Sequence, residues 1–297
     1  MHKSGFINII GQPNVGKSTL MNTLVGEKMS IITSKPQTTR HRIIGIVSGE
    51  DFQFIFSDTP GFVNNPRYKM HEAMNKFVQT TFKDADLMIF VTDPFEHYAE
   101  DSYILSKLRH IEVPLFLVIN KIDLVDQKKI AELINFWNVL VPNFKETIPI
   151  SALLGKNTDK LLELIKDNLP EGPVFYPKDQ LTDRPEKFFV SEIIREKILI
   201  LYKQEIPYSC EVEVESFKET TTKKGEKLIR ILANIYVSRK QQKSIIIGKD
   251  GSAIKRLGTL ARKDIEAFVD AKVFLELYVR VKENWRNDEK TLNRFGY

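Results

Sequence analysis

The stretch Gly11-Gln-Pro-Asn-Val-Gly-Lys17-Ser18 limits what this chain can fold into more than any other part of the sequence. It has the spacing G-x-x-x-x-G-K-S, follows the apolar residues 6–10 and precedes residues 18–25, which have helical character. The glycines allow a tight turn whose backbone N–H groups face one centre, and the positive end of the next helix strengthens their attraction for an anion. The pattern therefore predicts a phosphate-binding loop, with a Gly-rich turn that binds nothing as the alternative.

A second segment should complete the phosphate and metal site. Lys17 would reach the β- and γ-phosphates, and Ser18 would offer its hydroxyl group to Mg²⁺. Asp58, at the end of the apolar run 52–56, is the expected carboxylate on the Mg²⁺ side, and the backbone N–H of Gly61 could sense the γ-phosphate. Asp-Thr-Pro-Gly alone could be a plain turn, but its place about 40 residues after the loop favours a nucleotide site.

The segment between these motifs should supply one more Mg²⁺ ligand. Residues 29–42 are rich in Ser, Thr and Pro, and the ligand is expected within residues 37–41, Gln-Thr-Thr-Arg-His. Thr39, just before Arg40, is the preferred ligand, and Thr38 is its competitor.

The purine base should be read by two later segments. Residues 114–119 form a buried type of strand that ends in Asn120-Lys121-Ile122-Asp123. The Asp123 carboxylate can accept two hydrogen bonds from guanine, whereas adenine would leave it buried and unpaired, so the pattern selects GTP over ATP. Asn120 would tie the loop down, and the Lys121 stem could cover the base. The backbone N–H groups of Ser151-Ala152 should reach the guanine O6 atom.

The position after Gly61 bears on hydrolysis. Ras-like proteins carry a water-positioning glutamine there, but this chain has Phe62, which cannot orient water. Either hydrolysis is slow or another group helps. Asn14 is a candidate because the chain resembles GTPases in which an asparagine at this place binds K⁺, which could neutralise transition-state charge. The alternative is that Asn14 only stabilises the turn.

The fold expected for residues 1–170 is an α/β domain with a mostly parallel sheet covered by helices on both faces, because strand-like and helix-like runs alternate. The motifs stand in the order of the translation-factor-like GTPases. Four prolines between residues 170 and 185 indicate a linker at 171–186. The net charge of the chain is +5, with −1 on residues 1–185 and +6 on residues 186–297, so a polyanionic partner should meet the second half.

Residues 187–284 predict an α+β domain with the element order αββααβ. A helix is followed by two alternating strands with the polar hairpin connection 220–225, two helices around residues 248–251, and a last strand at 273–281. This order is that of a type II KH domain, and Gly-Lys-Asp-Gly between the helices resembles its G-x-x-G loop. A plain helix–helix turn is the alternative for that loop.

The surroundings of this loop favour RNA binding. Residues 239–263 hold eight basic residues and one acidic residue, and the isoleucines at 245–247 and 254 could form a floor for unstacked bases. The residues expected to contact RNA are Ile247, Gly248, Lys249, Asp250, Gly251, Lys255 and Arg256.

A phosphate-loop GTPase domain, a Pro-rich linker and a type II KH domain together resemble the Era family over essentially all 297 residues. The resemblance includes P-Q-T-T-R-H-R at 36–42, R-E-K-I-L at 195–199 and the final F-G-Y. It implies a slowly hydrolysing GTPase that assists ribosome assembly and binds the 3′ region of small-subunit ribosomal RNA, with the GTP state favouring binding. It also implies a cytoplasmic monomer with peripheral inner-membrane association. The single cysteine, Cys210, fits a reducing compartment.

Other classes of protein share some of these sequence features. A nucleotide-regulated RNA adaptor with negligible hydrolysis is the main alternative, given Phe62. A tRNA-modifying GTPase would need a further catalytic domain, for which the chain has no residues left, and Asp123 disfavours an ATPase or kinase. The tail, residues 285–297, could stack on RNA or pack on the domain, and packing is preferred.

The expected site combines catalytic, metal-binding and nucleotide-binding residues. The candidate catalytic residues are Lys17, Thr39, Gly61 and Asn14, and the candidate Mg²⁺ ligands are Ser18, Thr39 and Asp58. The cofactors are GTP or GDP and Mg²⁺, with K⁺ as a candidate. The residues expected to bind nucleotide are Gly11, Gln12, Pro13, Asn14, Val15, Gly16, Lys17, Ser18, Thr19, Asp58, Thr59, Pro60, Gly61, Asn120, Lys121, Ile122, Asp123, Ser151 and Ala152.

Overall fold

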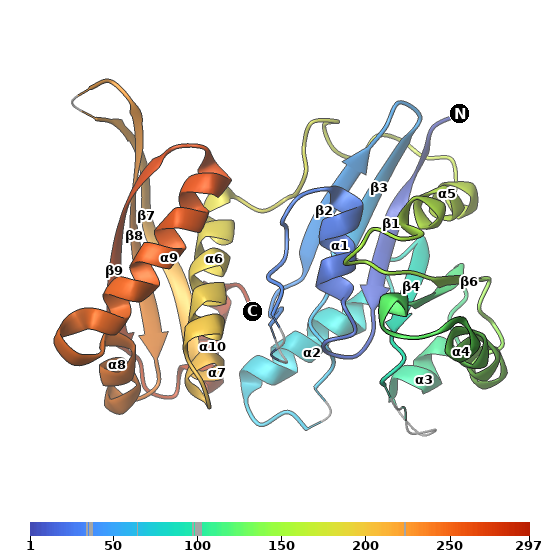
Figure 1. Cartoon of the computed structure of the whole chain (residues 1–297), viewed down its shortest axis with the longest axis horizontal. Helices are drawn as coiled ribbons and strands as arrows, with labels where there is room; N and C mark the ends of the chain where they lie inside the picture. The colour runs from blue at the N-terminus through green and yellow to red at the C-terminus, as the bar shows by residue number, and fades with distance from the viewer. Residues whose placement is uncertain (34, 36–37, 64, 97, 99–102, 223) are drawn as a thin grey trace. The chain divides into compact units, whose positions relative to one another are not determined.

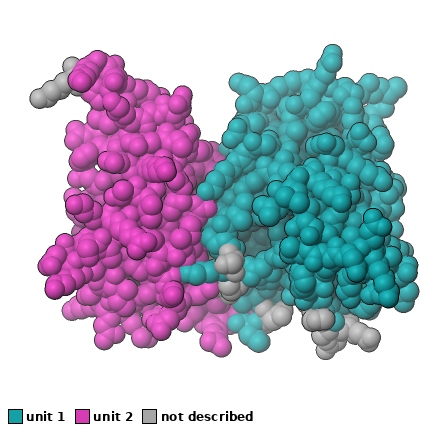
Figure 2. Space-filling view, in the orientation of Figure 1, with its two compact units in different colours: residues 1–65, 73–183 teal, residues 66–72, 184–297 magenta. Residues whose placement is uncertain are grey.

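The computed structural model describes residues 1–33, 35, 38–63, 65–96, 98, 103–222 and 224–297, which form two compact units (Figure 2). Within these ranges, residues 1–65 and 73–183 make up the first unit, and residues 66–72 and 184–297 make up the second. Positions 34, 36 and 37 of the predicted Mg²⁺-binding segment, and position 223 of the predicted hairpin connection, lie outside the described residues.

The first unit is built on a six-stranded sheet with the order β2-β3-β1-β4-β5-β6 (Figure 1). Its strands are β1 (Lys3–Ile10), β2 (Ile43–Ser48), β3 (Phe52–Asp58), β4 (Leu87–Thr92), β5 (Leu115–Ile119) and β6 (Glu146–Pro149). Strand β2 pairs antiparallel with β3 at one edge, and the other described pairings are parallel. This arrangement confirms the predicted mostly parallel α/β sheet, whose strands are buried because helices cover both faces.

The helices between residues 17 and 168 are α1 (Lys17–Val25), α2 (Lys69–Thr81), α3 (Tyr103–Leu108), α4 (Gln127–Leu140) and α5 (Thr158–Asn168), with a 3-10 turn η1 at Ile122–Leu124. Residues of α3 and α4 share one apolar cluster with β4 and β5, in which Trp137 packs edge-on against Phe90. Helix α1 contacts α5 and covers β2, where Met21 and Val25 flank Gly45. The absence of a side chain at Gly45 lets α1 approach the sheet.

The predicted linker is docked on the first unit as far as residue 183. Gln53, fully buried in β3, donates to the Tyr176 carbonyl at 2.8 Å and accepts from the Tyr176 N–H at 2.9 Å. At the edge of the sheet, the Ile46 N–H of β2 donates to the Leu181 carbonyl at 2.8 Å. The prolines exclude a helix or a central strand here, as predicted. The hydrogen bonds to the sheet fix the path of the segment, so it is not a flexible linker up to residue 183.

The second unit has a three-stranded sheet with the order β7-β8-β9, formed by β7 (Cys210–Thr221), β8 (Lys227–Val237) and β9 (Lys272–Val281). Strands β7 and β8 are antiparallel, and β8 and β9 are parallel. The main helices are α6 (Glu186–Leu201), α8 (Lys240–Ile247) and α9 (Ser252–Val269), and a short α7 (Ile206–Ser209) precedes β7. Ile198, Ile231 and Ile265 come from α6, β8 and α9 and meet in one apolar core. The predicted αββααβ order is confirmed, with α7 as an addition.

The tail packs on the second unit through η3 (Trp285–Asn287) and α10 (Glu289–Phe295). Trp285 is fully buried, donates from Nε1 to the Ser209 carbonyl at 3.1 Å and packs edge-on against Phe295. Arg294 forms an ion pair with Glu213 at 2.5 Å. Packing, the preferred prediction for the tail, is confirmed, because its aromatic side chains complete the unit.

Candidate functional site

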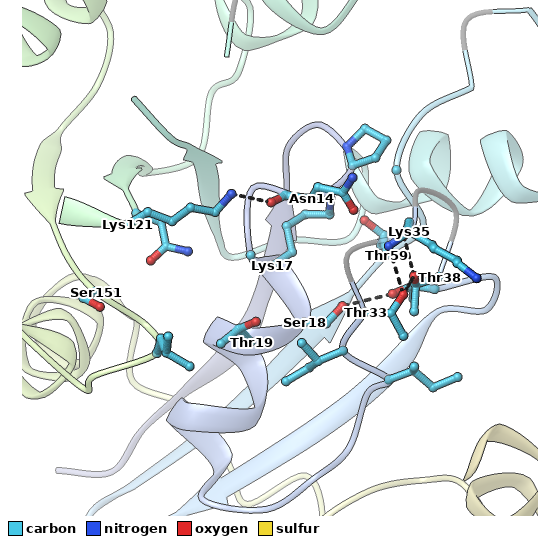
Figure 3. A pocket seen from close by; sticks show the side chains of 18 of the residues that line it. Asn14, Lys17, Ser18, Thr19, Thr33, Lys35, Thr38, Thr59, Lys121 and Ser151 are labelled. Carbon is cyan, nitrogen blue, oxygen red and sulfur yellow. Dashed lines mark hydrogen bonds between the residues drawn. The ribbon is translucent and has the colours of Figure 1, made fainter. Parts of the chain in front are cut away.

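Segments from all the nucleotide motifs meet at one pocket of about 470 Å³ in the first unit (Figure 3). Several of them follow directly after strands β1, β3 and β5, the place where open α/β sheets bind ligands. The predicted residues that line the pocket are Pro13, Asn14, Gly16, Lys17, Ser18, Thr19, Thr39, Thr59, Gly61, Asn120, Lys121, Asp123 and Ser151. Gly11, Gln12, Val15, Asp58, Pro60, Ile122 and Ala152 are outside this set and stand next to its members in sequence.

The phosphate loop is held by its own lysine. Lys17 is buried, and its Nζ donates to the carbonyl groups of Gly11 at 2.9 Å and Gln12 at 2.6 Å. Burial lowers the pKa of Lys17 to about 8, although the negative charges of Asp58 and Glu96 oppose that shift. Phosphate oxygens placed here would raise this pKa again, since an anion favours the protonated form.

Three oxygen-bearing side chains converge beside Lys17. Ser18 Oγ donates to Asp58 Oδ2 at 2.7 Å and shares a hydrogen bond with Thr39 Oγ1 at 3.0 Å. Asp58 is fully buried, and its Oδ1 accepts no hydrogen bond from the described residues. Burial raises the pKa of Asp58, against the opposing charge of Lys17 and the hydrogen bond from Ser18. Hydroxyl and carboxylate oxygens with unused acceptor capacity fit Mg²⁺, which prefers oxygen ligands.

The two candidate threonines differ in their surroundings. Thr38 Oγ1 donates to the Lys35 carbonyl at 2.6 Å and lies 2.7 Å from Thr33 Oγ1 (Figure 3). Thr39 Oγ1 instead lies next to Ser18. The structure therefore brings Thr39, and not Thr38, to the oxygen cluster.

The base side of the pocket is organised by Asn120. Its Nδ2 donates to the Val15 carbonyl at 2.8 Å, and its Oδ1 accepts from the Ala152 N–H at 2.9 Å. Thr23, which the sequence did not single out, donates to the Ala152 carbonyl at 2.8 Å. Thr23 lies one helical turn beyond Thr19, and the neighbouring sequence does not indicate that it contacts Ala152.

The expectation that the Ser151 and Ala152 N–H groups reach the base needs correction. Ser151 N donates to the Lys156 carbonyl at 3.1 Å, because residues 151 and 156 form a β-bridge, and Ala152 N is bonded to Asn120. Both groups are thus used inside the protein. Leu153, the next residue, does line the pocket and was missed by sequence reasoning.

Phe62 is half-buried and packs against the apolar cluster of α3, α4 and β4, and it is not among the described residues that line the pocket. The side chain that replaces the water-positioning glutamine therefore packs against the core and does not face the pocket. Asn14 does line the pocket, with its backbone in the left-handed region at φ 69°. Its carbonyl accepts from Lys121 Nζ at 2.7 Å.

The candidate RNA loop joins α8 to α9 in the second unit. A Cβ atom at Gly248 would lie 2.6 Å from the Ala253 Cβ, so this position needs glycine for space. Gly251 has room for a side chain but a φ of +73°. The exposed predicted contacts are Lys249, Asp250, Lys255 and Arg256, and Ile247 is half-buried. Ile246 is fully buried in the core, so it cannot form part of a floor for bases as expected.

Known families match both halves of the chain. The family described as a 50S ribosome-binding GTPase matches residues 6–121, and the family described as a KH domain matches residues 205–286. GTPase Era from Clostridium kluyveri is 47% identical over 298 residues, which cover 100% of both chains. GTPase Era from Clostridium tetani is 48% identical over 298 residues, which cover 100% of this chain and 99% of the relative.

Two crystal structures share the fold over nearly the whole chain. An Aquifex aeolicus Era variant bound to GDP and AlF4⁻ gives a TM-score of 0.92 at 35% identity, with 99% of both chains covered. Era in complex with MgGDPNP and nucleotides 1506–1542 of 16S ribosomal RNA gives a TM-score of 0.93 at 35% identity, with 100% of this chain and 99% of the other covered.

The sheet order, the motifs gathered at one pocket and the KH unit define a phosphate-loop GTPase with a C-terminal KH domain. Identity of 47% to a known relative over its full length narrows this class further. The chain belongs to the Era family, as the resemblance in its sequence predicts, and it is a GTPase that binds GTP and GDP.

Proposed function

We propose that this GTPase is a ribosome-assembly factor whose KH domain binds the 3′ region of small-subunit ribosomal RNA, with the nucleotide state controlling that binding. One observation carries the proposal: an Era structure 35% identical to this chain holds both MgGDPNP and a 16S ribosomal RNA segment. We assign residues 1–170 to the GTPase domain, 171–186 to the linker, 187–284 to the KH domain and 285–297 to the tail.

The RNA assignment is tested with the basic residues of the loop. Replacing Lys249 and Lys255 together by alanine should weaken binding of a 16S 3′-end oligonucleotide about tenfold and make its salt dependence shallower by about two units. Lys227→Ala is the matched control, because Lys227 is exposed in the same unit but paired with Glu219. Preference for a large-subunit RNA fragment, which the 50S description of the matching family would suggest, would overturn the assignment.

The nucleotide switch needs a physical connection between the pocket and the linker. Thr39 lies four residues before β2, and β2 in turn bonds to Leu181 of the docked linker through Ile46. Ordering of Thr39 by a γ-phosphate could therefore bias the linker. Equal affinity of the RNA for the GTP-analogue and GDP forms would rule out the switch while leaving both binding sites in place.

We assign Ser18, Thr39 and Asp58 as the residues that hold Mg²⁺, with Lys17 and the Gly61 N–H contacting the phosphates. When bound, Mg²⁺ would neutralise charge on the β- and γ-phosphates. We also assign Asn14 as a K⁺ ligand. Steady-state GTP turnover in KCl and in NaCl at equal ionic strength tests this role, and equal rates would exclude it.

A nucleotide-regulated adaptor with negligible hydrolysis is the second candidate, and Phe62 favours it because its side chain packs against the core instead of lining the pocket. Multiple-turnover phosphate release with and without RNA separates the two functions. Release above the background of a Lys17→Met variant supports the enzyme, and a single turnover in both conditions supports the adaptor.

Family resemblance extends the proposal to a cytoplasmic monomer with peripheral contact to the inner membrane. No helix within the described ranges combines the length and apolar character that a membrane span requires. Flotation with vesicles of bacterial lipid tests the peripheral contact, and protein that stays with the soluble fraction at low salt would contradict it. Sedimentation of the purified chain tests the monomer.

A further inference from the structure

We propose that Asp93 is a positioning residue for guanine-nucleotide binding, which holds Lys121 so that it joins the base-reading loop to the phosphate loop. Asp93 follows β4 and belongs to none of the sequence motifs. Its Oδ2 lies 2.5 Å from Lys121 Nζ, and the same ammonium group donates to the Asn14 carbonyl at 2.7 Å (Figure 3 shows the second bond). The proposal rests on the nucleotide role assigned to this pocket.

Lys121 and Asn14, which are joined by the second of these bonds, both have a positive φ. Asn14 has a φ of 69° and Lys121 a φ of 61°, in the left-handed region, which asparagine tolerates but a lysine enters at a cost that its surroundings must offset. The bond from Lys121 Nζ helps to hold the turn at Asn14, and the ion pair to Asp93 fixes the end of the Lys121 side chain. Asp93 therefore acts on the phosphate loop through Lys121.

Asp93 is also held in place by contacts other than its ion pair with Lys121. Its side chain is 5% exposed, whereas that of Lys121 is 32% exposed. Its Oδ1 accepts from the Phe95 N–H at 2.9 Å, and the neighbouring Thr92 carbonyl accepts from the Asn120 N–H at 2.8 Å. A carboxylate held in this way offers a prepared acceptor, and a charge-assisted bond in a buried place is roughly twice as strong as a neutral one.

Another acidic side chain lies near this group. Burial raises the pKa of Glu96 to about 7, and the charge of Asp93 adds to that rise, while Lys121 opposes it. Glu96 accepts from the Tyr98 hydroxyl group at 2.6 Å, whereas the ammonium group of Lys121 donates to Asp93. Asp93 is thus the carboxylate that the geometry pairs with Lys121.

The test compares Asp93→Asn with a matched control in the intact protein. Asparagine has the same shape and can still accept from Phe95, so the turn after β4 is kept while the charge is lost. Asp126→Asn is the control, because Asp126 caps α4 by accepting from Lys129 N, and asparagine caps a helix equally well. Release of fluorescent GDP, kcat and KM for GTP, and the melting temperature are measured for each variant.

Asp93→Asn should speed GDP release and raise KM about tenfold, because the nucleotide is held less firmly. The kcat value should stay within about twofold of the wild-type value, because nucleotide that is bound reacts as it does in the wild type. Asp126→Asn should match the wild type, and Asp93→Glu, which keeps the charge, should recover part of the loss. In a Lys121→Met background, Asp93→Asn should change release less than about twofold, since residues that act through each other are not additive.

Two results would overturn the role of Asp93. One is full additivity of the Asp93 and Lys121 substitutions, and the other is a lower melting temperature with unchanged GDP release below that temperature. Failure of the wild-type protein to retain guanine nucleotide would instead contradict the proposed function of the pocket, so the two failures are distinguishable.

Discussion

A Cβ atom at Gly16 would lie 2.2 Å from Asn120 Nδ2, because the Asn120 amide reaches across the phosphate loop to the Val15 carbonyl. Gly16 also has a φ of +98°. Both space and backbone conformation therefore require glycine here. The contact joins the loop that would bind phosphate to the loop that would read the base, so the two halves of the site form one structure.

Gly16→Ala should abolish nucleotide binding while leaving the fold intact, because the added methyl group displaces Asn120. We expect GDP affinity to fall at least about 100-fold in a fluorescence titration. Gly26→Ala is the control, since Gly26 also has a positive φ of 81° but a Cβ there would meet nothing within 4 Å. It should cost about 1 kcal/mol of stability and leave GDP affinity unchanged. Equal loss of binding in both variants would contradict the argument.

Asp123→Asn should change the preferred base from guanine to xanthine. An amide can accept from the xanthine N1–H and donate to its C2 carbonyl, whereas the guanine exocyclic amine loses its acceptor. GTP affinity should fall at least about 100-fold and XTP affinity should rise, measured by competition against fluorescent GDP. Unchanged discrimination between GTP and XTP would show that Asp123, although it lines the pocket, does not read the base.

Thr39→Ala should affect the metal site and Thr38→Ala should not. Thr39 lies beside Ser18, whereas the Thr38 hydroxyl group is bonded to Lys35 and Thr33. In thermal melts with a GTP analogue, the stabilisation added by Mg²⁺ should shrink clearly in Thr39→Ala, and hydrolysis should slow at least about tenfold. If Thr38→Ala gives the larger effect, the two assignments must be exchanged.

Trp285→Ala should destabilise the second unit strongly, because it leaves a cavity and removes the donor to the Ser209 carbonyl. The expected loss is about 3–5 kcal/mol in urea unfolding. Tyr297→Phe keeps the ring, removes the hydroxyl group that donates to Glu211 and should cost about 1 kcal/mol. A neutral Trp285→Ala would show that the tail is not part of the folded core.

The stability of the protein should depend on pH through Glu96. Burial raises its pKa from 4.5 to about 7, so the folded state holds the proton more tightly than the unfolded state. Stability is therefore lost as pH rises from about 4.5 to about 7. Because the side chain is partly exposed, solvent screening limits the loss of stability to about 1 kcal/mol. Glu96→Gln should gain this amount relative to the wild type between about pH 4.5 and about pH 7, whereas exposed Glu27→Gln should show no such change.

Much of the site could be predicted because its chemistry depends on short, fixed spacings. Asp58 ends β3, Asn120 directly follows β5, and Lys17 begins the helix after β1, and parallel strands bring such ends together. The linker was predicted from its prolines, but its docking on Gln53 was not, because a buried glutamine in a strand gives no sign of its distant partner.

The amino-acid sequence by itself determined the two domain types, the order of their elements and most of the predicted residues that line the pocket, because periodicity and motif spacing are local properties. Only the tertiary structure decided which threonine lies beside Ser18, that the Ala152 N–H is bonded to Asn120, and that Asp93 meets Lys121. Each of these depends on side chains that lie 20 or more residues apart and meet only when the sheet is assembled.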